Sequence, residues 1–280
     1  MKFTKMHGCG NDYVYIDCTK APLADPEHMA ITLSDRHFGV GGDGMILICP
    51  SEVGDFRMAM YNADGSEGNM CGNGIRCVGK FVYDKGLTQK TDLTIETKSG
   101  LKYLNLEVEN GLVSRVRVDM GKADWSAPAV PVVGMGDSVI GQPVEIDGKT
   151  WEMTCISMGN PHAVVWADEV AHLPLEEIGP HFETHPMFPE RVNTEFIRVI
   201  DDHTLEMRVW ERGSGETLAC GTGACASVVA AYLNHRTGPK ATVQLRGGAL
   251  EIELAENGHV YMTGPACTVF EGELHDEIFA

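Results

Sequence analysis

The sequence has little positive charge and no long hydrophobic run, and both shortages exclude classes of partner. Lysine and arginine together number 22, against 40 aspartate and glutamate residues, which gives a formal net charge of -18. Nucleic acids and anionic membranes attract basic proteins, so neither is expected as the main partner. The longest apolar stretch, residues 224–233, is too short to span a bilayer, and no signal peptide is recognisable. We therefore expect a cytoplasmic globular protein.

Paired metal-binding cysteines are also missing. The chain has nine cysteines but no Cys-x-x-Cys pair, so neither a zinc site nor a disulfide framework is favoured. Small buried thiols are common in protein cores. We expect that role for Cys18, Cys49, Cys155 and Cys267.

Two other cysteines stand in matching glycine-rich turns. Cys71-Gly72-Asn73-Gly74 and Cys220-Gly221-Thr222-Gly223 each open a predicted helix. A helix N-terminus lowers the pKa of a thiol and presents backbone N–H groups that can bind a carboxylate. Two such ends could hold one carboxylate, with one sulfur on each face of the attached carbon. This pattern favours an amino-acid racemase or epimerase in which one thiol starts as thiolate and the other as thiol.

Other chemistries explain the two motifs less well. A cysteine–histidine hydrolase leaves the second cysteine motif without a role. A pyridoxal enzyme needs a Schiff-base lysine, and no feature singles one out, so no cofactor and no metal are expected. A redox dithiol stays possible, because two thiols within reach of one carbon could also oxidise.

The two motifs belong to a longer internal repeat. The cysteines at 71 and 220 are 149 positions apart, and the same offset places Asn11 on Asn160 and Glu67 on Glu216. The alternating segment 56–60 likewise falls on 205–209. We interpret the chain as a diverged duplication with an α+β fold. It forms two pseudo-symmetric domains facing each other across a cleft, each a strand-rich, barrel-like sheet around a central helix.

Alternating apolar and polar residues predict a meander of strands after each cysteine helix. An Asp25-Pro26 pair predicts the start of another helix. The expected strands are Thr91–Lys98, Leu101–Glu109, Leu112–Met120, Ala241–Arg246, Ala249–Ala255 and His259–Gly264.

Several further segments carry a family resemblance. They are Lys5–Asp12, Asn62–Glu67, Met70–Cys77, Ser157–His162 and Glu211–Ala226. In this order they resemble the motifs of the diaminopimelate epimerases, from one end of the chain to the other. The resemblance implies cofactor-independent interconversion of LL- and meso-diaminopimelate, a step toward lysine and peptidoglycan precursor. It also implies a homodimer. Residues 1–120 with 265–280 would form the half that carries Cys71, and residues 121–264 the half that carries Cys220.

The resemblance also implies roles for individual residues. Cys71 and Cys220 would be the acid–base pair, with His162 and Glu211 beside the reacting centre and its amine. The backbone at Gly72-Asn73 and Gly221-Thr222 would bind the carboxylate. Substrate recognition would fall to Asn11, Asn62, Asn160, Asn193 and Arg212.

Two positions depart from the family pattern. Gly44 stands where some members place a glutamine, so one polar contact is missing or comes from elsewhere. Cys9 stands where a residue without a thiol is usual, and we expect it to serve packing. Two alternatives stay open: a proline or hydroxyproline racemase-type enzyme on the same scaffold, and a non-catalytic protein that binds amino acids or senses redox state.

Overall fold

The computed structural model describes residues 1–275 and 278. The chain divides into two compact units. The first unit comprises Met1–Val118 and Gly264–Ala280, and the second comprises Asp119–Thr263. In the described part of the chain, no helix is both long and apolar enough to cross a membrane.

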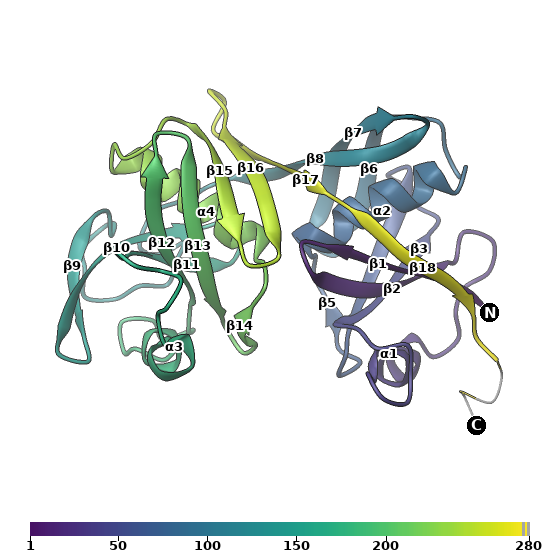
Figure 1. The fold of residues 1–280 in the computed structure, drawn as a ribbon, viewed down its shortest axis with the longest axis horizontal. Coiled ribbons are helices and arrows are strands. Elements are labelled where there is room, and N and C mark those ends of the chain that lie inside the picture. The colour runs from purple at the N-terminus through teal and green to yellow at the C-terminus, as the bar shows by residue number, and fades with distance from the viewer. Residues whose placement is uncertain (276–277, 279–280) are drawn as a thin grey trace. The chain divides into compact units, whose positions relative to one another are not determined.

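The first unit surrounds helix α2 with strands and carries helix α1 on its outside (Figure 1). Its helices are α1 (Pro26–Ser34) and α2 (Gly72–Asp84). Its strands are β1 (Lys2–Gly8), β2 (Asn11–Asp17), β3 (Gly44–Cys49), β4 (Phe56–Asn62), β5 (Glu67–Gly68), β6 (Asp92–Thr97), β7 (Gly100–Glu109), β8 (Leu112–Lys122, which continues into the second unit) and β18 (Cys267–Glu273).

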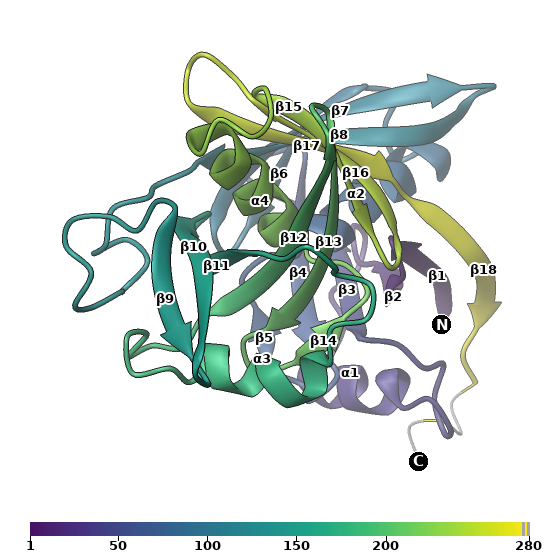
Figure 2. The same ribbon diagram turned by 60° about the vertical axis from the view of Figure 1, so that its left-hand side comes forward.

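The second unit places helix α4 among its strands in the same way (Figure 2). Its helices are α3 (Leu175–Glu183) and α4 (Gly221–Leu233). Its strands are β9 (Gln142–Ile146), β10 (Lys149–Ser157), β11 (Pro161–Trp166), β12 (Asn193–Asp201), β13 (Thr204–Glu211), β14 (Gly215–Thr217), β15 (Lys240–Leu245), β16 (Gly248–Leu254) and β17 (His259–Pro265, whose last residues enter the first unit).

Strand pairing follows the same plan in both units. The first has the order β18-β1-β2-β3-β4-β6-β7-β8, and the second β9-β10-β11-β12-β13-β15-β16-β17. The pairs β2–β3 and β4–β6 are parallel, as are the corresponding pairs β11–β12 and β13–β15. The C-terminal strand β18 pairs with β1 as β9 pairs with β10. This correspondence confirms the α+β fold and the duplicated architecture.

The two central helices are buried because of their sequences. In α2 the side chains of Ile75, Val78 and Val82 are fully buried. The helix also packs closely on β7, since a Cβ atom on Gly79 would lie 2.9 Å from Leu106 and 3.0 Å from Leu104. Helix α4 is apolar nearly all round and is buried along most of its length.

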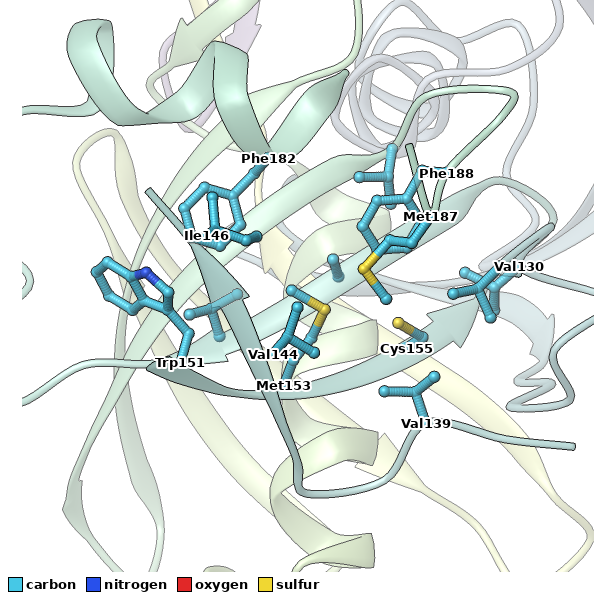
Figure 3. Close-up of a cluster of buried hydrophobic side chains, with 14 of the residues drawn as sticks. Val130, Val139, Val144, Ile146, Trp151, Met153, Cys155, Phe182, Met187 and Phe188 are labelled. Atoms are coloured by element: carbon cyan, nitrogen blue, oxygen red, sulfur yellow. The ribbon is translucent and has the colours of Figure 1, made fainter. Parts of the chain in front are cut away.

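An aromatic cluster anchors the second unit. Trp151 and Phe182 meet edge to face at 5.4 Å between ring centroids, in a cluster that also takes in Met153 and Cys155 (Figure 3). Phe196 packs against Phe182 at 5.0 Å. Such pairs add about 0.5–1.5 kcal/mol beyond the apolar area that they bury.

The expectation that four cysteines are buried is confirmed for only some of them. Cys18 and Cys155 are buried, and Cys49 is partly exposed. The expectation is wrong for Cys267, which is exposed. It lies on β18, whose side chains face solvent along nearly the whole strand.

Candidate active site

Each cysteine of the repeated motif caps the N-terminus of its helix. The Cys71 Sγ accepts a hydrogen bond from the backbone N–H of Gly74 at 3.3 Å. The Cys220 Sγ accepts one from Gly223 at 3.4 Å. Both cysteines have extended backbone angles, as N-cap residues do. The structure therefore places the two thiols in equivalent positions, at the positive ends of corresponding helices.

In the first unit, Asn11 is the immediate neighbour of Cys71. The thiol donates to Oδ1 of Asn11 at 3.1 Å, while Nδ2 of Asn11 donates to Asp43 at 2.7 Å. Asp43 also accepts from the backbone N–H of Asp12 at 3.1 Å and from Arg36 at 2.9 Å. A carboxylate can only accept hydrogen bonds, so Asp43 turns the amide oxygen of Asn11 toward the sulfur.

Tyr13 is a second polar neighbour of Cys71. Its buried side chain lies close to the side chains of Cys71 and Asn11. Burial raises the pKa of Tyr13 strongly, and the nearby Cys71 raises it further. The phenol therefore keeps its proton and can donate it toward the sulfur.

The geometry around Gly44 explains why this position holds a glycine and not a larger residue. Tyr13 on β2 pairs with Gly44 on β3. A Cβ atom at this glycine would lie 2.8 Å from the Tyr13 ring and would collide with the carbonyl oxygen of Tyr61. Tyr13 thus fills the space and brings a hydroxyl group into this part of the site.

In the second unit, His162 and Glu195 form a buried pair. Nδ1 of His162 lies 2.7 Å from Oε1 of Glu195, and both side chains are wholly excluded from solvent. The other ring nitrogen, Nε2, lies 3.1 Å from Oδ1 of Asn160. Asn160 in turn donates to Oγ1 of Thr222 at 3.3 Å, and that hydroxyl lies 3.5 Å from the Cys220 Sγ. A continuous chain of polar contacts therefore links His162 to the thiol.

Burial and two carboxylates keep Cys220 protonated. Burial raises the pKa of this thiol well above its ordinary value, and Glu211 and Glu195 raise it further. These effects outweigh the lowering by the Gly223 N–H, so our expectation of a lowered pKa at the helix mouth is wrong for Cys220. Glu211 lies close to Cys220 and accepts a hydrogen bond from the Thr217 hydroxyl at 2.5 Å; burial raises the pKa of Glu211 as well. Cys220 is therefore a thiol at neutral pH.

Asn193 and Arg212 lie at the corner where β12 and β13 approach β11. Asn193 is buried, donating to the carbonyl of Pro161 at 2.8 Å and accepting from the backbone N–H of Arg212 at 3.0 Å. The Arg212 side chain is exposed, and its guanidinium donates to the carbonyl of Glu190 at 3.0 Å. Asn193 therefore fixes the backbone from which Arg212 projects.

In the first unit, the remaining predicted residues lie at the ends of β4 and α2. Asn62 ends β4 and donates to the Ser66 hydroxyl at 3.0 Å. Gly72 and Asn73 are buried in the first turn of α2, and the fully buried Arg76 donates to the Gly72 carbonyl at 3.1 Å.

Cys9 is buried next to this turn. The guanidinium of Arg76 lies 3.6 Å from the Cys9 sulfur. Burial raises the pKa of the Cys9 thiol. The expectation that Cys9 serves packing is therefore confirmed.

The structure gathers several of the predicted residues around the cysteine of each unit, whereas the side chains of Asn62 and Arg212 hydrogen-bond with Ser66 and with the Glu190 carbonyl. In the first unit, Asn11 and the first turn of α2 surround Cys71. The second unit brings Asn160, His162, Glu211 and the first turn of α4 around Cys220. Among residues 1–275 and 278, no three or more histidine, cysteine or acidic side chains are arranged to hold a metal ion.

Sequence reasoning missed several residues that support these clusters. They are Tyr13, Asp43, Arg76, Glu195 and Thr217. The internal repeat could have identified one of them, because the offset of 149 aligns Tyr13 with the predicted site residue His162. The same offset places Gly44 on Asn193 and Asn62 on Glu211.

The sequence matches one known family along most of its length. The profile of the diaminopimelate epimerases covers residues 3–126 and 154–269. A diaminopimelate epimerase of Agathobacter rectalis is 56% identical, with 98% of this chain and 99% of the relative aligned. One from Methanococcus maripaludis is 54% identical over 98% of this chain and 99% of the relative. The chain belongs to the diaminopimelate epimerase family. It is therefore an isomerase.

Solved structures with low sequence identity share the fold. A phenazine biosynthesis protein of the PhzF family from Bacillus anthracis aligns with a TM-score of 0.70 at 16% identity, covering 98% of this chain and 99% of the other. A hydroxyproline epimerase from Agrobacterium vitis aligns with a TM-score of 0.64 at 15% identity, covering 98% and 90%. At such identities the likeness shows the fold alone.

Proposed function

We propose that this protein interconverts LL- and meso-diaminopimelate without a cofactor, using Cys71 and Cys220 as two bases on opposite faces of one α-carbon. Family membership supports the substrate. The observation that carries the mechanism is the equivalent placement of the two cysteines, each at the N-cap of the central helix of its unit.

The protonation of Cys220 gives the two thiols different starting roles. Because burial and two carboxylates raise the pKa of Cys220, it begins as the proton donor. Cys71 must then supply the thiolate, and the protonated Tyr13 phenol beside it can donate to the charged sulfur. The Cys71 thiolate takes the α-proton and becomes a thiol, and the carbanion takes the proton of Cys220, which becomes a thiolate. The reverse reaction exchanges these roles.

The carbanion must be stabilised while it forms. Backbone N–H groups in the first helical turns, at Gly72-Asn73 and Gly221-Thr222, would bind the carboxylate on the reacting carbon. Fixed dipoles of this kind lower the barrier because they need no rearrangement as charge develops. Glu211 would lie beside the substrate amine, since it is close enough to Cys220 for each to raise or lower the pKa of the other. His162 would act through Asn160, which separates its imidazole from Thr222.

The other end of the substrate needs donors and acceptors for a second zwitterion. The exposed guanidinium of Arg212 suits a carboxylate, because a guanidinium can bind it through two parallel hydrogen bonds. The amides proposed to contact substrate or to orient such contacts are those of Asn11, Asn62, Asn160 and Asn193.

The proposed setting is lysine biosynthesis in the cytoplasm, with the enzyme as a homodimer. Membership of a biosynthetic family supports the location, and the family resemblance supports the dimer. Size-exclusion chromatography with light scattering would distinguish a dimer, near twice the chain mass of 30.5 kDa, from a monomer.

Exchange of the α-proton in D₂O tests the function directly. LL-diaminopimelate and L-proline are incubated separately with reduced enzyme, and the α-proton is followed by NMR. Deuterium in diaminopimelate alone supports the proposal. Exchange into proline instead would assign the chain to the proline racemase type. No exchange into either would indicate a binding or sensing protein.

A further inference from the structure

A second pair of thiols lies in the first unit, at the opposite ends of β2 and β3 from Tyr13 and Gly44. The two strands are parallel, and Asp17 is paired with Ile48. The next positions in that register are Cys18 and Cys49. The backbone N–H of Cys18 still donates to the carbonyl of Ile48 at 2.8 Å, so the strands remain adjacent there.

The two side chains meet in one hydrophobic cluster. Cys18 is part of the core formed by β2, β3 and α1, and Cys49 packs against it. Each thiol shifts the pKa of the other, so the two sulfurs lie close together. The site is therefore a dithiol whose members come from adjacent strands.

The two sulfurs have unequal surroundings. Cys49 is partly exposed and is paired across the sheet with Arg57 on β4, whereas Cys18 is 4% exposed. The nearby Cys18 thiol lowers the pKa of the Cys49 thiol despite its partial burial, and the Arg57 charge lowers it further. The nearby Cys49, together with burial, raises the pKa of Cys18. Cys49 is thus the reactive, accessible thiol, and Cys18 is its buried partner.

We propose that Cys18 and Cys49 form a peroxide-reactive site that closes to an intrachain disulfide. The Cys49 thiolate attacks one oxygen of hydrogen peroxide, which gives a sulfenic acid and releases hydroxide. The Cys18 sulfur then attacks the Cys49 sulfur and loses its proton, and the sulfenic oxygen leaves as water. Two thiols are oxidised, and one peroxide is reduced to two waters.

The strand geometry allows the bond to form with little movement. Adjacent strands lie about 4.8 Å apart. Disulfides span Cα–Cα distances of about 4.4–6.8 Å. The new bond would close the chain between β2 and β3, including α1, and would add a covalent link where the two strands end.

Peptide mapping of the complete protein tests this proposal. The protein is treated with hydrogen peroxide, its remaining thiols are alkylated, and it is digested with trypsin without reduction. We expect residues 6–20 to be linked to residues 37–57, two hydrogens lighter than the separate peptides. Dithiothreitol should reverse the link. Because Cys9 is also in the first peptide, fragmentation must place the bond on Cys18, and the Cys9→Ala variant must still form it.

Two variants separate the roles of the thiols. In Cys18→Ala, dimedone should label Cys49 as a trapped sulfenic acid, whereas in Cys49→Ala it should leave Cys18 unlabelled. Oxidation should raise the urea midpoint of the wild type and leave that of Cys18→Ala unchanged. Recovery of both thiols alkylated after peroxide treatment would overturn the proposal, and so would dimedone on Cys18 in Cys49→Ala. Neither result bears on epimerisation, which is measured separately under reducing conditions.

Discussion

Nδ1 of His162 lies 2.7 Å from Oε1 of Glu195, with both side chains wholly buried. Replacing Glu195 by glutamine keeps the shape of the side chain but removes its charge. We expect Glu195→Gln to lower the free energy of unfolding by about 1–3 kcal/mol, because the imidazole loses a charged partner. Urea denaturation measures this loss. Glu256→Gln, at an exposed site, should be nearly neutral; equal effects in the two variants would show that the buried pair contributes nothing.

Gly223 makes room for the same carboxylate. A Cβ atom at this position would lie 3.0 Å from Cγ and Cδ of Glu195 and closer still to Oε1. Alanine usually stabilises a helix interior, but here we expect Gly223→Ala to destabilise by about 1–3 kcal/mol through overpacking.

The matched control for Gly223 is Gly238→Ala. A Cβ atom at Gly238 meets nothing within 4 Å. This variant should be neutral or more stable by up to about 1 kcal/mol. A Gly223→Ala protein that melts at or above the wild-type temperature would contradict the close packing of α4 on Glu195.

The Tyr13 hydroxyl should assist Cys71. Tyr13→Phe removes a hydroxyl that can donate to the Cys71 sulfur while it carries charge in the reaction, and losing such a hydrogen bond corresponds to a loss of kcat of about 10- to 100-fold. Tyr15→Phe is the control on the same strand, because its hydroxyl donates to the carbonyl of Gly74 at 3.2 Å. It should cost about 1 kcal/mol of stability and leave kcat within about twofold. Equal kcat values for Tyr13→Phe and the wild type would show that the Tyr13 hydroxyl does not assist Cys71.

The raised pKa of Cys220 makes stability depend on pH. In the unfolded chain this thiol ionises near its ordinary value of 9.0, while in the folded state it keeps its proton to a higher pH. The folded state binds more protons in that range, so its stability falls as pH rises through about 9, by at most about 1.4 kcal/mol per pH unit.

Cys220→Ser should lack this one contribution. The difference in unfolding free energy between wild type and variant is measured from pH 7 to pH 10.5. It should stay constant below about pH 8 and then shift against the wild type. A difference that does not change with pH would show that the thiol titrates alike in both states.

Periodicity and capping signals predicted much of the fold. The six predicted meander strands form close to their expected bounds, because alternation reports which face of a strand is buried. The two cysteine N-caps could likewise be predicted, since a Cys-Gly-x-Gly turn before an apolar run favours a helix start. The exposure of Cys267 was not, because it depends on how β18 pairs with β1.

The electrostatics of the site could not be predicted in the same way. The local sequence around Cys220 suggests only a helix N-terminus, which lowers a thiol pKa. The two carboxylates that act against it come from β12 and β13, at Glu195 and Glu211. Tyr13 likewise comes close to Cys71, and Asp43 acts on it through Asn11, only once β2 and β3 are paired next to α2.

The central claim is that Cys71 and Cys220 act on opposite faces of one carbon. It is tested most directly by enzymatic turnover of LL-diaminopimelate in D₂O, stopped at low conversion, with deuterium measured in both isomers. Two separate bases predict that the meso product carries deuterium at the inverted carbon while the remaining LL substrate stays unlabelled. Cys71→Ser and Cys220→Ser should each slow this turnover by about 10³-fold. Equal labelling of substrate and product, or undiminished turnover in either variant, would contradict the account.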